Sequence, residues 1–174
     1  MPEIPEGITM KRHRDLEGRR WHIWAQRAGL ALLTALVITA LLNVFGQRPS
    51  TVSAASPAAT LSLNAPDSLR GGLLFGAHIT VQAHREIKNA VLVLDEGWLD
   101  GFTMNTMQPT PLGSASRDGK LILTLGHIPA GHSYTLWMQF QVNATQVGID
   151  RQNVVLLDGQ QRLAELHRSV TTYP

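Results

Sequence analysis

Residues 134–142, YTLWMQFQV, decide the fold, because apolar and polar side chains alternate along them without a break. This period of two is typical of a β-strand that buries one side and exposes the other. The stretch therefore predicts a strand that turns Leu136, Met138 and Phe140 toward a core. Trp137 should lie on the opposite side, among glutamines that face solvent.

Several other stretches carry strand patterns. Residues 75–83 and 121–125 alternate in the same way, and residues 90–94 are apolar on both sides, as in a central strand. Further strands are expected at 153–157 and 162–171, with a turn at Asp158-Gly159. Seven or eight short strands separated by turns predict an all-β, immunoglobulin-like β-sandwich over residues 60–174. Since the chain has no cysteine, this sandwich would have no disulfide.

A family resemblance lies just before the decisive stretch. In residues 123–134, LTLGHIPAGHSY, a glycine ends one strand and a Pro-Ala-Gly turn leads into the next. This resembles the "conserved repeat" immunoglobulin-like domains of bacterial cell-surface proteins. Residues 94–99, LDEGWL, and the later Pro109 are similar to the same family's Leu-Pro-x-Gly turn, with Asp95 in place of the proline. The resemblance implies the fold and a structural or adhesive role, and it implies no catalytic residues.

A second pattern precedes the domain. Residues 28–46, AGLALLTALVITALLNVFG, contain no charge and would cover about 28 Å as a helix, close to the hydrocarbon thickness of a bilayer. They predict a single-pass transmembrane helix. The alternative is a cleaved secretory signal, but the long apolar run and the 27 polar residues before it favour an uncleaved anchor.

The residues around this span predict its orientation in the cell membrane. Six basic residues precede it: Lys11, Arg12, Arg14, Arg19, Arg20 and Arg27. Because Lys and Arg stay on the cytoplasmic side, the N-terminus should be inside and residues 60–174 should be periplasmic or extracellular. Trp21, Trp24 and Arg27 are expected to anchor the helix at the lipid headgroups.

The domain boundaries follow from these patterns. Residues 1–27 form a basic cytoplasmic tail, 28–46 the span, 47–59 a linker rich in Pro, Ser and Ala, and 60–174 the sandwich. The outer domain is close to neutral and has no basic stripe, so we expect no nucleic-acid partner. The Ala, Leu and Arg usage is typical of a bacterial protein.

Candidate metal ligands are few. His78 and His84 lie on one strand about 20 Å apart, too far to share a metal ion, and His127 and His132 flank a turn without a third ligand nearby. Met104 and Met107 could bind Cu(I) only with a turn histidine beside them. We therefore expect neither a metal nor a cofactor.

Enzyme motifs are equally weak. Ser114, Ser116 and Ser133 lie in expected turns without a G-x-S-x-G elbow. The acidic group Asp95, Glu96 and Asp100 lacks the spacing of an EF-hand. The sequence therefore predicts a protein without catalytic activity.

Two features favour partner binding. Ala31, Ala35, Thr39 and Asn43 recur every four residues and form a stripe of small and polar side chains suited to a neighbouring transmembrane helix. Trp137, exposed by alternation, and Trp98, in its acidic loop, are candidate interface anchors.

These features predict a non-catalytic accessory or assembly subunit that docks on a larger integral membrane protein through its span and its outer domain. The alternative is an extracytoplasmic binding module for an envelope ligand or a metal ion, with the histidine-bearing turns or the Trp98 loop as its site. Self-association is left open.

Overall fold

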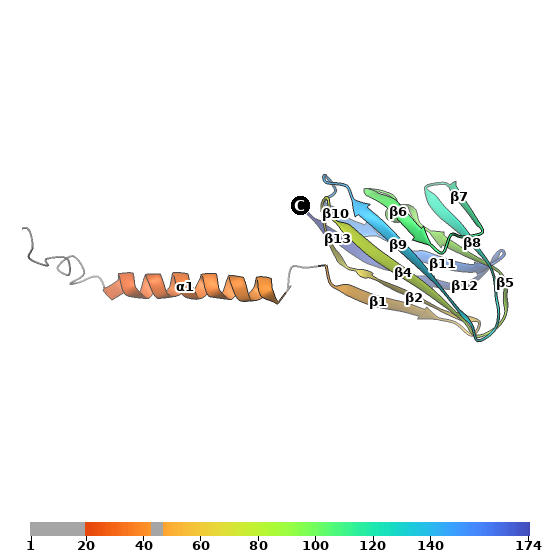
Figure 1. The fold of residues 1–174 in the computed structure, drawn as a ribbon, viewed down its shortest axis with the longest axis horizontal. Coiled ribbons are helices and arrows are strands. Elements are labelled where there is room, and N and C mark those ends of the chain that lie inside the picture. The colour runs from red at the N-terminus through yellow and green to blue at the C-terminus, as the bar shows by residue number, and fades with distance from the viewer. Residues whose placement is uncertain (1–19, 43–46) are drawn as a thin grey trace, which may run out of the picture. The chain divides into compact units, whose positions relative to one another are not determined.

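The computed structural model describes residues 20–42 and 47–174. The chain divides into two compact units between residues 45 and 46, the first with the helix and the second with every strand (Figure 1).

The helix α1, Arg20–Leu41, has 22 residues. Its stretch Trp21–Leu41 is long and apolar enough to cross a membrane, and none of it is buried against protein. The helix begins eight residues before the predicted span at residue 28, so the last eight residues of the predicted tail are helical. Residues 21–27 contain neither proline nor glycine, and extending an existing helix through them is easy compared with starting one. Residues 1–19 of the predicted tail and 43–46 of the predicted span lie outside the described residues.

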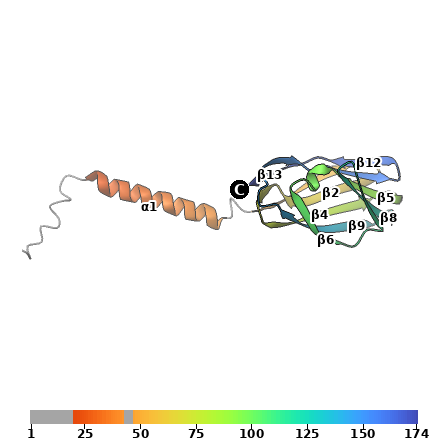
Figure 2. The same ribbon diagram turned by 90° about the horizontal axis from the view of Figure 1, so that it is seen from above.

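The second unit is a β-sandwich of two five-stranded sheets, with a small third sheet at one end (Figures 1 and 2). The first sheet has the order β1-β2-β4-β9-β6, with strands Pro49–Ala55, Ala59–Pro66, Leu74–Ala83, Ser133–Val142 and Phe102–Gln108. The second has the order β12-β11-β5-β8-β7, with strands Gln161–Leu166, Val154–Asp158, Ile87–Leu94, Lys120–Ile128 and Gly113–Arg117. The third has the order β10-β13-β3, with strands Gly148–Arg151, Ser169–Tyr173 and Ser68–Arg70. A 3₁₀ turn, η3, covers Glu96–Trp98.

The strands predicted from alternation are confirmed. Residues 75–83, 90–94, 121–125 and 134–142 lie in β4, β5, β8 and β9. Residues 153–157 largely form β11, whereas 162–171 divide into β12 and β13 around His167-Arg168. Burial alternates along β4 and β9 as expected: the residues predicted to point inward are buried, apart from half-buried Tyr134, and those between them are more exposed.

The predicted linker at 47–59 is wrong over most of its length. Residues Pro49–Ala55 form β1, which pairs antiparallel with β2 from Pro49↔Pro66 to Ala55↔Thr60. β1 is an edge strand in which no residue is fully buried. An edge strand therefore needs no large apolar side chain, and it tolerates a proline at its first position.

The core lies between the two large sheets and is closed at one end by Trp98. The Phe75 and Phe140 rings stack with centroids 5.3 Å apart, and the Trp98 ring lies 5.5 Å from that of Phe140. Trp98 has no exposed surface, and its Nε1 donates a hydrogen bond to the Asn153 carbonyl at 3.1 Å. The prediction of Trp98 as a partner-binding residue is therefore wrong. The η3 turn directs the indole inward, where a large side chain fills the end of the sandwich.

Candidate functional site

The outer side of the first sheet is the candidate site, and we call its outward-pointing residues the Trp137 face. All five strands of this sheet lie within residues 47–174, and none contains Asp, Glu, Lys or Arg. The second sheet differs, since its strands carry Lys88, Asp158 and Glu165 among others. A whole sheet without charge leaves hydroxyl, amide and aromatic groups as the chemistry of this face.

The strand register places one residue of each strand in a row across the Trp137 face. Thr51 lies opposite Asn64, Asn64 opposite His78, His78 opposite Trp137, and Trp137 opposite Gln108. Asn64 Nδ2 donates a hydrogen bond to Thr51 Oγ1 at 2.8 Å. Trp137, which is 53% exposed, is thus the large exposed apolar side chain in an otherwise polar row.

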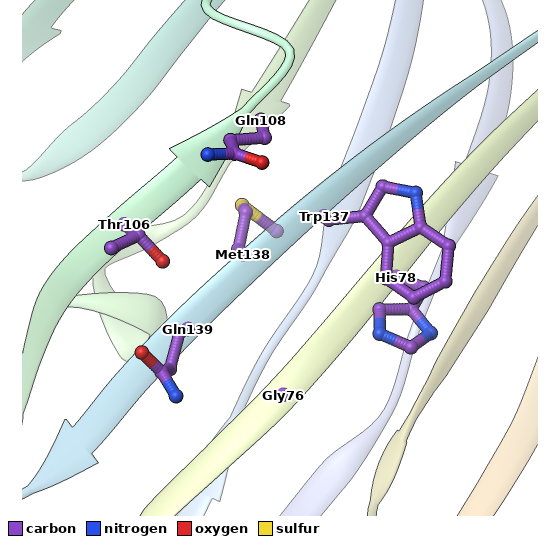
Figure 3. Close-up of a pocket in the computed structure, with 7 residues that line it drawn as sticks. All are labelled: Gly76, His78, Thr106, Gln108, Trp137, Met138 and Gln139. Carbon is purple, nitrogen blue, oxygen red and sulfur yellow. The ribbon is translucent and has the colours of Figure 1, made fainter.

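His78 supports the Trp137 indole from the neighbouring strand. The two ring centroids are 3.7 Å apart and the ring planes are inclined by 51° (Figure 3). This contact restricts the indole before any partner arrives. A restricted side chain loses less conformational entropy on binding, which favours affinity.

A shallow hollow of about 260 Å³ lies beside Trp137. Gly76, Thr106, Gln108 and Gln139 line it together with the indole (Figure 3). Gly76 contributes no side chain, and β6 has an irregular register between Met104 and Thr106, which displaces its outer residues. The two amides can both donate and accept hydrogen bonds, so the hollow suits an uncharged polar group.

The histidines predicted as weak metal candidates have other partners. His127 Nε2 lies 3.0 Å from Glu86 Oε1, His84 Nε2 lies 2.8 Å from Thr60 Oγ1, and His132 Nδ1 lies 3.3 Å from the Ala130 carbonyl. Within residues 20–42 and 47–174, no three His, Asp or Glu side chains are grouped to hold a metal ion. Met104 and Met107 are partly buried and pack against the core.

The three serines named above lie on strands. Ser114 and Ser116 lie on the exposed edge strand β7 and Ser133 begins β9, so their expected placement in turns is wrong. Of the acidic group, Asp95 precedes η3, and burial raises the pKa of its carboxyl. Glu96 and Asp100 are exposed.

Two sets of residues on α1 were predicted to have a role: the headgroup anchors and the stripe of small residues. Trp21 and Trp24 are exposed, and the Arg27 guanidinium lies 5.7 Å from the centre of the Trp24 ring. Ala31, Ala35 and Thr39 follow one another at four-residue spacing along α1, and Asn43 lies outside the described residues. Thr39 Oγ1 donates to the Leu36 carbonyl at 2.8 Å, so its hydroxyl needs no neighbouring helix. The stripe can therefore favour a partner helix by letting the two helix backbones approach closely, and not through a hydrogen bond from Thr39.

The second sheet presents a more apolar outer side. Val155, Val93 and Ile122 lie side by side across β11, β5 and β8, all half-buried, with Glu165 next to them on β12. The amino-acid sequence alone does not predict this row, because register between strands cannot be obtained from the order of residues along the chain.

The comparisons with known proteins give structural similarity only. No protein-family model matches the chain, and no curated protein matches it. The chain is similar to CaCohA2 from Clostridium acetobutylicum, with 13% identity over 67% of this chain and 92% of that one, and a TM-score of 0.46. It is also similar to a non-cellulosomal cohesin from Archaeoglobus fulgidus (10% identity, 72% and 92% covered, TM-score 0.42). A Niemann-Pick type C2 protein from Japanese carpenter ant is similar at 10% identity (71% and 99% covered, TM-score 0.42). Similarity at this level transfers no function, and the resemblance to conserved-repeat domains stays a prediction.

Proposed function

We propose that this chain is a non-catalytic accessory or assembly subunit of a larger membrane protein. In this proposal α1 anchors the chain in a bacterial cell membrane with its N-terminus inside. The sandwich, of immunoglobulin-like type, lies outside and docks through the Trp137 face. The observation that carries the proposal is the outer side of the first sheet, which has no charged residue and presents the half-exposed Trp137 packed against His78.

Two physical arguments support docking. The centres of protein interfaces are depleted of charged residues and enriched in aromatic residues. The strands of the Trp137 face contain no charged residue, and Trp137 is its exposed aromatic anchor. Large apolar side chains of α1, such as Leu30 and Leu33, are exposed on the helix. An uncovered apolar helix of this length is stable in lipid, where its backbone hydrogen bonds are all internal. The Trp21, Trp24 and Arg27 side chains at its start suit the headgroup layer.

Replacing Trp137 with alanine should reduce recovery of the partner at least tenfold. An interface Trp that acts as an anchor contributes about 2 kcal/mol or more to binding, and about 1.4 kcal/mol already corresponds to a factor of ten. The measurement is quantitative mass spectrometry of proteins that co-purify with the tagged full chain in mild detergent.

Leu112→Ala is the matched control, because Leu112 is an exposed apolar residue between β6 and β7, outside the strands that form this face. Its recovery should equal that of the wild type. Unchanged recovery for Trp137→Ala would refute docking through this face. The row of Val155, Val93 and Ile122 on the second sheet would then be the next candidate docking surface.

A double substitution on α1, Ala35→Leu with Thr39→Leu, should likewise reduce partner recovery at least tenfold. Leucine at both positions prevents close approach of a neighbouring helix while keeping the helix apolar. The control is Leu33→Ile with Val37→Leu, which changes side-chain shape on another side of the helix without removing apolar bulk.

Membranes that contain the wild type or either helix variant are also extracted with carbonate. All three proteins should stay in the membrane pellet. If the Ala35 and Thr39 variant recovers as much partner as the wild type, the small stripe is no interface. Release of the intact wild-type chain by carbonate would refute the anchoring itself. Co-purification of two differently tagged copies of the chain would show that the neighbour is a second copy.

A second candidate function is a binding module for an uncharged envelope ligand, such as a neutral glycan. The observation that favours it is the hollow beside Trp137, which Thr106, Gln108 and Gln139 line together with the indole. The two candidates respond differently to the same variants. Trp137→Ala should impair both, whereas the Ala35 and Thr39 variant should impair only docking on a membrane protein.

A further inference from the structure

The end of the sandwich where the chain enters carries most of its exposed apolar side chains. We call this the proximal end. Pro49 and Pro66 are paired there, β4 begins there, and β13 ends there against β3 (Figure 1). Leu73 is tied into the same region, because its carbonyl accepts a hydrogen bond from the Val142 amide and its own amide donates to the Arg70 carbonyl.

Seven large apolar residues between 47 and 174 are exposed, and five of them lie at the proximal end. These five are Leu73, Leu74, Val147, Ile149 and Tyr173. Ile149 is the most exposed of them, at 72%. Tyr173 pairs with Arg70, and Ile149 pairs with Thr171 on the same strand as Tyr173, so the five come from adjoining segments. An exposed apolar group of this kind marks a surface that contacts something other than water.

Arginines are among the exposed charges of the proximal end. Arg48, Arg70 and Arg151 are exposed there. Of the nearby acids, Asp67 interacts with the buried Arg168 guanidinium, and Asp150 accepts a hydrogen bond from Gln146 Nε2 at 3.0 Å. Glu96 and Asp100, in the segment around η3 that lies next to β10, are exposed. Exposed arginines beside apolar groups match the lipid interface, where phosphates lie above the acyl chains.

The chain length between helix and sandwich limits where this end can be. Only residues 43–46 separate Leu42 from Gln47, and the five steps between them reach at most about 18 Å when fully extended. If α1 spans the membrane, the proximal end must lie within reach of the headgroups. The turns at the other end of the sandwich, such as Pro129–Gly131, are about 30 Å farther away along the ten-residue strand β9.

We infer that the proximal end rests on the outer leaflet of the membrane. Leu73, Leu74, Val147, Ile149 and Tyr173 lie in the headgroup layer, and Arg70 and Arg151 contact lipid phosphates. The inference rests on the proposed anchoring by α1 and adds to it. It fixes the sandwich against the lipid, so that the Trp137 face is presented sideways to a neighbouring membrane protein.

The absence of cysteine allows single labelling positions in the full chain. The chain is reconstituted into phosphatidylcholine–phosphatidylglycerol nanodiscs with an NBD fluorophore on Ile149→Cys, and doxyl lipids serve as quenchers. Val147→Cys is a second label in case the first disturbs β10. Ala130→Cys is the control at the far end, and Leu36→Cys reports whether α1 is in the lipid.

Labels at positions 149 and 147 should be quenched several-fold more than the label at 130, and high salt should weaken the difference. If the label at 36 is quenched but those at 149 and 147 match that at 130, the lipid contact is refuted while the anchor stands. If the label at 36 is also unquenched, the anchoring fails, and the proposed function with it.

Discussion

Trp98→Ala is expected to lower the free energy of unfolding of the sandwich by about 3–5 kcal/mol, the range for deleting a buried aromatic side chain. The indole is fully buried and contacts Phe140. It also lies 6.0 Å from the guanidinium carbon of Arg168, a buried cation whose pKa is lowered by burial. Because a domain has only about 5–15 kcal/mol of stability in total, this single change should remove a large share of it.

The measurement is proteolysis of the full chain in detergent after equilibration in urea, which reports the unfolded fraction of the sandwich. Trp137→Ala is the matched control, since it deletes the same side chain from an exposed position. The control should lose less than about 1 kcal/mol, mostly through its contact with His78. Equal losses for the two variants would contradict the assignment of Trp98 to the core and Trp137 to the surface.

The contrast between these two tryptophans shows how far sequence reasoning reaches. Alternation placed Trp137 correctly because its strand has nine consecutive residues with strict period two. Trp98 follows Asp95 and Glu96 in a short turn, where no period applies and acidic neighbours suggest solvent. Its burial depends on the 3₁₀ turn and on the open end of the sandwich, which only the assembled sheets define.

Dependence on distant parts of the chain also explains why the sequence pattern does not predict β1. β1 is built from Pro, Ser, Thr, Val and Ala, a composition typical of linkers, and it becomes a strand because β2 provides a partner edge. The His78 contact with Trp137 and the gathering of Leu73, Ile149 and Tyr173 are also long-range. They depend on strand register and on β13 lying parallel to β3, neither of which local patterns contain.

Gly97→Ala should destabilise the sandwich by about 3 kcal/mol or more, at the upper end of overpacking effects. A methyl group on Gly97 would lie 1.8 Å from the carbonyl oxygen of Arg151 and 2.9 Å from its carbonyl carbon. Both are backbone atoms, so relief requires η3 to move away from β10 and cannot come from a rotating side chain. The same movement would strain the hydrogen bond from Gln152 Nε2 to the Gly97 carbonyl, and Gln152 is fully buried.

Gly131→Ala provides the control for this substitution. Gly131 has a φ of +79°, but a methyl group there would meet nothing within 4 Å. Its loss should therefore be limited to the backbone strain of about 1–2 kcal/mol that an L-residue incurs in the left-handed region. The same urea and proteolysis measurement compares the two. If Gly97→Ala is no more damaging than Gly131→Ala, then η3 does not lie against β10 as closely as described, and the placement of Trp98 above the core loses its main support.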